Sequence, residues 1–381
     1  MYRNVMMVSW LLILMSFAIS ADEWQQYYQQ SQQIKAQDQA FLQAELTAHG
    51  LTELTSPTST RRFGFDTGQP LSWYQTAAGQ AVADAILSLQ TPSGGWSKRT
   101  DMTQPRLPGQ NFGVEAGYVP TFDNSATTTQ LHVLARAYTA TGNSAYRAAF
   151  ERGIRLILTA QYPHGGWPQN FPLTGGYHDH VTLNDEVTED ILNLLWHSLQ
   201  AEREFAFVSE ELRHAIRPQF EKGLQMVMRL QQTDDEGLSL WAAQYHHRQL
   251  EPAWARAYEM PALATAESAT LLDFLMQLPE PPAELQASIH AAMHWYQRHQ
   301  ILDYHWHPTK RVLMHEAGAG PIWPRFAELG SNRPVFGDRD GSLYYDVHQV
   351  SLERRQGYGW YTDKPAATLA RYQVWLQQFL D

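Results

Sequence analysis

The sequence predicts an all-α (mainly) protein whose helices form an α/α toroid of about three helix-pair repeats, with long loops forming a cleft. From Trp73 onward, apolar residues recur with a helical period in segments such as AAGQAVADAILSLQ and EDILNLLWHSLQAE. A Gly-Gly-Trp turn ends at Trp96 and again at Trp167, 71 residues later. No convincing series of alternating strands is present. Helices that recur at a fixed spacing favour an architecture in which each pair packs on the next.

The first 21 residues have the character of a Sec-type signal peptide. Arg3 precedes an apolar run from Val5 to Ile19, and small residues occupy positions 18, 20 and 21. This run is shorter than the roughly 20 residues that a membrane-spanning helix needs. We therefore expect cleavage near Ser20 or Ala21, export to the periplasm or the medium, and no permanent membrane anchor.

Two segments follow this leader. Residues 22–72 are expected to be an N-terminal extension. Its first part, residues 22–50, is rich in Gln, Ala and Glu and predicts a helix, whereas residues 51–72 contain TSPTSTRR and DTGQP, which are typical of a loop. Residues 73–381 are expected to form the toroid as one catalytic domain, because the helical pattern continues through them.

Each copy of the repeat ends a helix on glutamine and then turns through glycine. The first two copies are LSLQTPSGGW and LTAQYPHGGW. A weaker third copy is LQQTDDEGLSLW, in which Gln232 lies 71 residues after Gln161. Glycine suits these turns because it adopts positive φ at little cost. For the repeated Gln and Trp we expect mainly a structural role, in which they tie neighbouring helices together.

Composition limits the partners of the chain. The formal net charge is −11 and no basic stripe is present, which disfavours a nucleic-acid partner. There are no cysteines, so an exported chain depends on its core, with or without a metal ion, for stability. The high content of Trp and Tyr suits either a sugar-like ligand or a large core. We expect a monomer.

Two pairs of acidic and amide side chains stand directly before predicted helices. Asp123 and Asn124 precede one helix, and Asn184 and Asp185 precede another. The two aspartates are 62 residues apart, which suggests equivalent points of two repeats facing one end of the toroid. Hard oxygen ligands in loops suit Ca²⁺. The alternative is that these residues are ordinary helix N-caps.

Arginines gather in the C-terminal third, within a chain that is acidic overall. They could recognise substrate carboxylates, since the planar guanidinium binds a carboxylate through two hydrogen bonds. Alternatively, they form structural ion pairs with Asp338, Asp340 and Glu353. The group consists of Arg325, Arg333, Arg339, Arg354 and Arg355.

A single arginine, Arg256, stands in the mostly apolar stretch PAWARAYEMP. A guanidinium stays charged at ordinary pH and is rarely buried without a partner. Its position after the third copy of the repeat places it on the same arc as Asp123 and Asp185. A bland alternative is an ion pair with Glu259 or Glu251.

Five sequence blocks occur in a recognisable order: TFDNSATTTQLHVLARAY, AAFERGIRLILTAQYPHGGWPQNFPL, YHDHVTLNDEV, PAWARAYEMPAL and LGSNRPVFGDRDG. Together they resemble the pectate lyases of polysaccharide lyase family ten. The similarity runs from about Trp73 to the C-terminus. It departs from the family pattern at Ser125, where a glycine is expected, and at Leu183, where an aromatic residue is expected.

The resemblance implies a cleft that binds polygalacturonate and cleaves it by Ca²⁺-assisted β-elimination to 4,5-unsaturated oligogalacturonides. It implies that Arg256 is the general base, that Asp123 and Asp185 are associated with calcium, and that Arg325 and Arg339 hold substrate carboxylates. Further substrate-binding candidates are Arg333, Asn124 and Asn184. Because arginine scarcely deprotonates, Arg256 needs nearby cations or an alkaline medium to act as the base, or it positions a water or hydroxide that does so.

Other readings of the sequence remain open. An α/α-toroid glycoside hydrolase would use paired carboxylates from Glu186, Glu189 and Asp190. A terpene-cyclase-like protein would need a better acidic motif than TDDE. A non-catalytic pectin-binding protein would bind polygalacturonate without cutting it. The histidine pairs at 178/180, 246/247 and 305/307 lack the HExxH or Cys partners of a zinc site.

Overall fold

The structure is a computed structural model that describes residues 19–61, 63–115, 117 and 119–379. Most of the predicted signal peptide lies outside this part of the chain. The α-helices run through Ala21–His49 (α1), Ala77–Ser88 (α2), Thr128–Thr141 (α3), Ser144–Ala160 (α4), Val187–Gln200 (α5), Glu210–Leu230 (α6), Thr265–Leu275 (α7), Ala283–Arg298 (α8), Leu352–Gly357 (α9) and Lys364–Leu376 (α10). None of these helices is long and apolar enough to cross a membrane.

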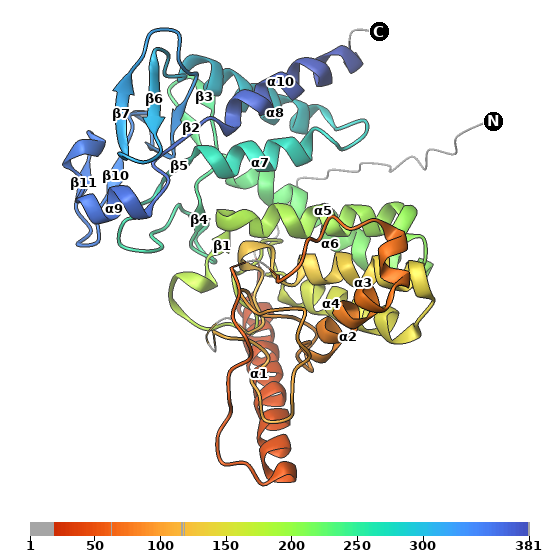
Figure 1. Ribbon diagram of the computed structural model, residues 1–381. Coiled ribbons are helices and arrows are strands. Elements are labelled where there is room, and N and C mark those ends of the chain that lie inside the picture. Colours follow the sequence, from red (N-terminus) through yellow and green to blue (C-terminus); the bar gives the residue numbers. More distant parts are fainter. Residues whose placement is uncertain (1–18, 62, 116, 118, 380–381) are drawn as a thin grey trace.

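Helices that follow one another in the chain pack together, as the repeat predicts. α3 lies on α4, α5 lies on α6, and α7 lies on α10 (Figure 1). Each buries one apolar face, as in α4, where Phe150, Ile154 and Ile157 are buried at helical spacing. The mainly α-helical prediction is confirmed, whereas closure of the helices into a toroid stays a prediction.

The repeated glutamines tie neighbouring helices together. The side-chain amides of Gln90, Gln161 and Gln231 each donate one hydrogen bond within their own turn and a second to a backbone carbonyl of a different helix. The second acceptors are Ala149 of α4, Gln219 of α6 and Ser288 of α8, at 2.8, 2.8 and 3.0 Å. The structural role expected for the repeat is confirmed. In the third copy, however, the equivalent residue is Gln231, not Gln232.

The repeated tryptophans fasten each turn to the helix that leads into it. The indoles of Trp96 and Trp167 donate to Ile86 and Ile157, each ten residues earlier, and Trp241 donates to Val227. These three rings are almost completely buried. A buried indole N–H needs an acceptor, so this bond fixes where the following loop begins.

Short antiparallel strand pairs connect the loops at one end of the helices, a feature that the helical pattern did not predict. The strand β5 pairs with β9 and β8 pairs with β12, so that residues far apart in the chain meet beside α7. The strands are Val181–Thr182 (β1), Thr233–Asp234 (β2), Gly237–Leu238 (β3), Gln244–Tyr245 (β4), Ala262–Ala264 (β5), Tyr304–His307 (β6), Val312–His315 (β7), Trp323–Pro324 (β8), Phe326–Glu328 (β9), Phe336–Gly337 (β10), Leu343–Tyr344 (β11) and Tyr361–Thr362 (β12).

Short 3₁₀ turns complete the described elements, and two of them matter for function. The turns are Leu71–Gln75 (η1), Asp123–Ser125 (η3), Gly176–Asp179 (η4), Asn184–Glu186 (η5), Arg203–Phe205 (η6), Val347–Gln349 (η7) and Gln377–Phe379 (η8). η3 and η5 pack against each other and lead into α3 and α5. They carry the Asx pairs noted in the sequence.

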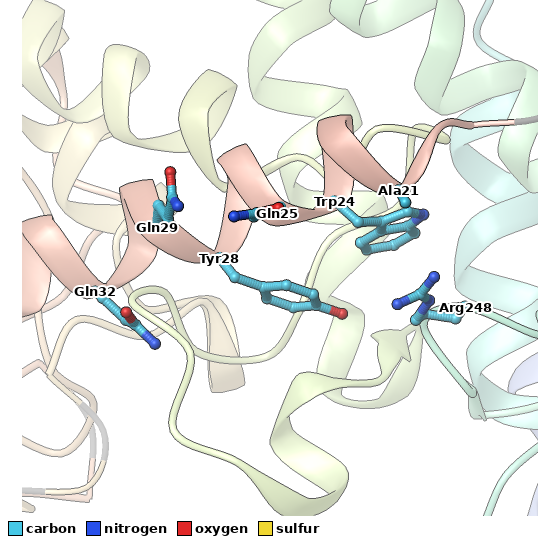
Figure 2. A pocket seen from close by; sticks show the side chains of 7 residues that line it. All are labelled: Ala21, Trp24, Gln25, Tyr28, Gln29, Gln32 and Arg248. Carbon is cyan, nitrogen blue, oxygen red and sulfur yellow. The ribbon is translucent and has the colours of Figure 1, made fainter.

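The N-terminal extension is one long helix, α1, that projects from the other helices (Figure 1). It begins with a capping box, in which Ser20 Oγ accepts from Glu23 N and Glu23 accepts from Ser20 N. Its first turns are anchored by Trp24 and Tyr27, which belong to the main hydrophobic core (Figure 2). The predicted helix over residues 22–50 therefore agrees with α1, and its base is part of the main core.

A second, smaller core lies under the C-terminal strands. It packs Phe326 and Phe336 against Trp360, with Tyr258 at its edge. Because residues from 258 to 360 share this core, it holds the loop of Arg256 against the arginine-rich segment. This packing positions the site described next.

Candidate active site

The two aspartates sit in backbone turns of the same shape. Asn124 and Asp185 both have left-handed φ, at 52° and 51°. Asn and Asp tolerate this region better than most residues, and such conformations concentrate at functional sites. Neither α3 nor α5 has a side-chain N-cap hydrogen bond, so the helix-capping alternative for these aspartates is wrong.

The repeat relates these turns with a spacing of 61 residues, one fewer than the sequence suggested. Thr127 Oγ1 donates to Thr121 O at 2.8 Å, and Thr188 Oγ1 donates to Thr182 O at 2.7 Å. Asp123 is therefore equivalent to Asn184, and Asn124 to Asp185. The expectation that the two aspartates are equivalent residues is wrong, although their carboxyls do meet.

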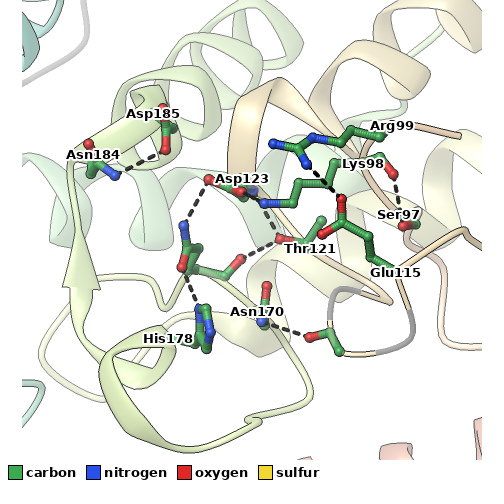
Figure 3. A network of polar contacts seen from close by, with 12 residues as sticks. Ser97, Lys98, Arg99, Glu115, Thr121, Asp123, Asn170, His178, Asn184 and Asp185 are labelled. Atoms are coloured by element: carbon green, nitrogen blue, oxygen red, sulfur yellow. Dashed lines mark hydrogen bonds and ion pairs between the residues drawn. The ribbon is translucent and has the colours of Figure 1, made fainter. Parts of the chain in front are cut away.

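Asp123 is buried and receives hydrogen bonds on both of its oxygens (Figure 3). Lys98 Nζ donates to Oδ2, and Gln169 Nε2 donates to Oδ1 at 2.8 Å. Gln169 in turn accepts from His178 Nδ1 at 2.7 Å, because its amide nitrogen is already used on Asp123. His178 and Gln169 thus fix the orientation of the Asp123 carboxylate.

Asp185 lies beside Asp123, within hydrogen-bonding reach. Burial and the neighbouring Asp123 carboxylate raise the pKa of Asp185 to about 7. Asn184 Nδ2 donates to Asp185 Oδ2 at 3.0 Å. Two carboxyls forced together in this way favour a shared proton or a shared cation.

The donor set suits a calcium ion only in part. Two hard carboxylate oxygens are the ligands that Ca²⁺ prefers, and the repulsion between Asp123 and Asp185 is relieved by a cation between them. Within the described residues, no group of three or more His, Cys, Asp or Glu side chains is placed to hold a metal. The protein thus offers a partial shell that water or ligand oxygens must complete.

Arg256 is held by Glu259 in a two-pronged ion pair. Nε donates to Glu259 Oε2 at 2.7 Å, and NH2 donates to Oε1. Burial lowers the pKa of Arg256, but the hydrogen bond and charge of Glu259 more than offset this, so its pKa lies above the ordinary value. The Arg256 side chain remains 43% exposed, whereas that of Glu259 is only 5% exposed. The ion pair expected as the bland alternative for Arg256 is therefore present.

Arg325 links the aspartates to Arg256. NH2 of Arg325 donates to Glu267, and to Asn184 Oδ1 at 3.3 Å. The Arg325 guanidinium lies 5.0 Å from the centre of the Tyr358 ring, and that of Arg256 lies 5.9 Å from the same ring. The Tyr358 hydroxyl donates to Glu259 at 2.8 Å. Tyr358 thus supports both arginines.

Three arginines surround the ring of Tyr258. The guanidinium carbons of Arg256, Arg339 and Arg354 lie 5.2, 5.7 and 4.4 Å from its centre. Arg339 also forms two hydrogen bonds of 2.9 Å with Glu353. Cations over an aromatic face are held without losing all of their charge to a carboxylate, so this cluster stays strongly positive.

Two of the predicted binding residues stand apart from these contacts. The Arg333 guanidinium lies 3.9 Å from the centre of the Tyr345 ring, and no described contact joins it to the other arginines. Asn124 is exposed in the turn η3, beside the buried Asp123. The remaining candidates form one chain of contacts, from Asp123 through Asp185, Asn184 and Arg325 to Arg256 and Arg339.

Several residues of this site were missed from the sequence. Lys98 lies in the run SKRT, Gln169 in WPQNF, and Tyr358 in the glycine-rich GYGW. His178 was noted only as one of a histidine pair. Burial lowers its pKa; Asp123 opposes this shift, and Lys98 and Arg256 add to it, which places His178 between the two walls of the site. Polar residues that follow a Gly-Gly-Trp turn were the available signal.

The chain matches known proteins over the part that contains this site. The family model described as pectic acid lyase matches residues 90–369. The family 10 polysaccharide lyase from Cellvibrio cellulosa is 32% identical, with a TM-score of 0.71 over 83% of this chain and 99% of its own. A mutant of the family 10 polysaccharide lyase from the same organism, in complex with trigalacturonic acid, is 32% identical, with a TM-score of 0.72 over 79% and 95%. No curated protein matches the chain.

A match over residues 90–369 spans the aspartates, Arg256 and the arginine cluster. The structural similarity extends over almost the whole length of the solved proteins at 32% identity. The chain therefore belongs to the pectic acid lyase family and is a polysaccharide lyase.

Proposed function

We propose that the protein cleaves polygalacturonate by Ca²⁺-assisted β-elimination in the site that joins Asp123, Asp185, Arg325, Arg256 and Arg339. The observation that carries this proposal is the unbroken line of contacts from two like-charged carboxyls to a row of arginines. A polyanion needs cations along its path, and this acidic chain concentrates them here. The trigalacturonic acid bound to the related lyase supports the same class of ligand.

The chemistry requires loss of a weakly acidic proton. In β-elimination, the C5–H bond breaks, its electron pair forms the C4=C5 double bond, and the C4–O bond breaks while the leaving oxygen takes up a proton from water. Asp123 and Asp185 would hold the calcium ion, with water and substrate oxygens completing its shell. Bound calcium would supply electrostatic stabilisation of the substrate carboxylate as negative charge develops on it.

The protein's own cations share this task. Arg325 is fixed by Glu267 and Asn184, so its guanidinium needs little reorganisation to meet a carboxylate. Arg339 is more exposed and pairs only with the exposed Glu353, a contact that a substrate carboxylate can replace. Asn184 and Asn124 offer amides to hydroxyl groups, and Arg333 offers a cation farther along the surface.

Arg256 takes the C5 proton, either directly or through a hydroxide that it positions. Glu259 holds the guanidinium in one orientation and raises its pKa, which opposes direct proton transfer in this arrangement. The positive charges of Arg339 and a bound cation act in the opposite direction. Both routes predict activity that increases with pH.

The test is the formation of an unsaturated product. Incubation with polygalacturonate and Ca²⁺ is expected to produce the ultraviolet absorbance of a 4,5-unsaturated uronide, and excess chelator is expected to abolish it. Reducing ends without this absorbance would indicate hydrolysis. Full turnover in excess chelator would contradict the role of calcium.

The alternative with paired carboxylates finds little support in the geometry. Glu186 forms an ion pair with Lys364 at 3.1 Å. Burial and the neighbouring Asp190 raise the pKa of Glu189 to about 9, but Glu189 lines a separate hollow with Asp273 and Arg371. This reading also leaves the arginine row without a role. Export through the N-terminal leader remains part of our proposal, and its test is the N-terminal residue of the secreted protein.

A further inference from the structure

A shallow groove lies along the first turns of α1, away from the residues assigned above (Figure 2). Its volume is about 320 Å³. Six of its lining residues lie on one stripe of the helix, three or four positions apart, and the seventh comes from the loop after β4. The lining consists of Ala21, Trp24, Gln25, Tyr28, Gln29, Gln32 and Arg248. α1 precedes the segment that matches the pectic acid lyase family, which begins at residue 90.

The charge in this groove belongs to Arg248. Its side chain is exposed, and the guanidinium carbon lies 5.2 Å from the centre of the Trp24 ring. Within the part of the chain that the structure describes, Arg248 forms no ion pair with a carboxylate, although the protein as a whole is acidic. Arginine held on an aromatic face, with its hydrogen-bond donors directed outward, suits a planar anion such as a carboxylate.

The floor of the groove is rigid. Trp24 packs among the rings of Tyr162, His164 and His247, with centres 5.3 to 5.8 Å away. The Tyr28 ring stacks on Trp24 at 5.8 Å, and its hydroxyl is hydrogen-bonded to His247 Nε2 at 2.9 Å. Tyr28 is only partly buried, so part of its apolar body faces the groove. A preformed floor of this kind reduces the entropy lost when a ligand binds.

The wall of the groove carries three amides. Gln25, Gln29 and Gln32 are exposed, and their side chains form no hydrogen bond with any residue in the described part of the protein. An amide both donates and accepts, which suits vicinal hydroxyl groups. One carboxylate, several hydroxyls and an apolar C–H surface are the groups that a uronic acid unit presents.

We propose that this groove is a second binding site for a galacturonate segment of a long substrate chain, a proposal that rests on polygalacturonate being the substrate. Arg248 binds a carboxylate, the glutamine amides bind hydroxyls, and Tyr28 contacts the sugar ring. The groove lies on the same side as the reaction, because Arg248 is eight residues before Arg256 and the rings of His247, His246 and His180 form a continuous contact toward η4. Two linked sites retain a polymer more strongly than either site does alone.

Chain length provides the test. Arg248→Gln is expected to raise KM for polygalacturonate by about 3- to 10-fold, because one of two linked contacts is lost. The same variant is expected to leave both kinetic constants for trigalacturonate within twofold of the parent, because a short ligand in the catalytic cleft does not reach α1. Arg155→Gln, which removes an equally exposed arginine elsewhere, is the matched control and is expected to change neither substrate.

A binding measurement separates this proposal from the proposed function. In calcium-free native gels containing polygalacturonate, Arg248→Gln and the Gln25→Ala/Gln29→Ala pair are expected to migrate faster than the parent and Arg155→Gln. Alanine favours the helix, so the double variant also shows whether a loss reflects folding. Equal migration and equal polymer KM in all four proteins would overturn the groove. Failure of the parent to form unsaturated product from trigalacturonate would overturn the lyase proposal, while the gel would still test the groove.

Discussion

At the scale of single residues, the central contact is that between Arg256 and Glu259. It decides whether Arg256 gives up a proton or only positions the group that does. Glu259 is buried, and it accepts hydrogen bonds from both Arg256 and Tyr358. The arginine is thus held in place by a charge that also makes it a poorer base.

Replacing this charge separates the two roles. Glu259→Gln keeps the shape and removes the charge that raises the pKa of Arg256. If Arg256 is itself the base, the alkaline limb of kcat/KM is expected to move to lower pH by about 1–3 units. A profile that keeps its position while kcat falls would instead assign Arg256 a positioning role.

The charge alone is not sufficient for the reaction. Arg256→Lys keeps a cation but loses the two-pronged contact with Glu259. We expect kcat to fall by about 100-fold or more, as when a general base is lost. The melting temperature should change little, because the arginine side chain is substantially exposed. A near-native rate would refute the assignment of Arg256.

Asp185 connects pH with stability. Its pKa is about 7 in the folded chain and lower when unfolded, so the folded state binds more protons and calcium-free stability falls as pH rises from about 4 to 7. Asp185→Asn removes the repulsion with Asp123. At pH 8 it is expected to stabilise the calcium-free protein by about 1 kcal/mol or more while abolishing activity. Urea unfolding in chelator measures this, and stabilisation that persists at pH 4 would contradict charge repulsion as its origin.

At the scale of elements, the repeat shows what a sequence pattern can and cannot place. The spacing of Gln90 and Gln161 revealed the helix pairs and their mutual ties. It failed in the third copy because the turn from Gln231 to Trp241 is longer, so counting from the second copy selects Gln232. It failed again by one residue at Asp185, because the two loops before η3 and η5 differ in length.

Two adjacent glutamines test this register. Gln231 is buried and joins Ser239 to Ser288 of α8, whereas Gln232 makes a local bond to Leu230. Gln231→Ala is expected to cost about 1–3 kcal/mol of unfolding free energy, because it leaves a buried carbonyl and hydroxyl unsatisfied. Gln232→Ala is expected to cost less than about 0.5 kcal/mol. Equal losses in chemical denaturation would disprove the assignment of the third copy.

At the scale of the whole molecule, the site depends on contacts between distant segments. Helical periodicity predicted the mainly α-helical fold and the leader's neighbour, α1, because both depend on local patterns. It did not predict that β5 pairs with β9, which brings Arg325 beside Asn184, since a strand pair of three residues has no detectable period. Lys98 and Gln169 were missed for the same reason: only the folded chain shows that they share Asp123.

The long helix α1 also belongs to the whole, although the family match begins after it. Trp24 is 5% exposed and part of the main core. Trp24→Ala is expected to cost about 3–5 kcal/mol in unfolding free energy, because it leaves a cavity among packed rings. Trp254→Ala, at a tryptophan that is 43% exposed, is the control and should be nearly neutral for stability. A small loss for Trp24→Ala would show that α1 is a separate appendage.

The capping box of α1 has a consequence for maturation. The predicted leader ends where Ser20 and Glu23 close the first turn of the helix. Cleavage after Ser20 would remove this cap and place a new ammonium group at Ala21, against the positive end of the helix dipole. Cleavage before Ser20 would keep the turn closed. The choice of scissile bond therefore decides whether the mature protein begins with a closed or a frayed helix, beside Trp24.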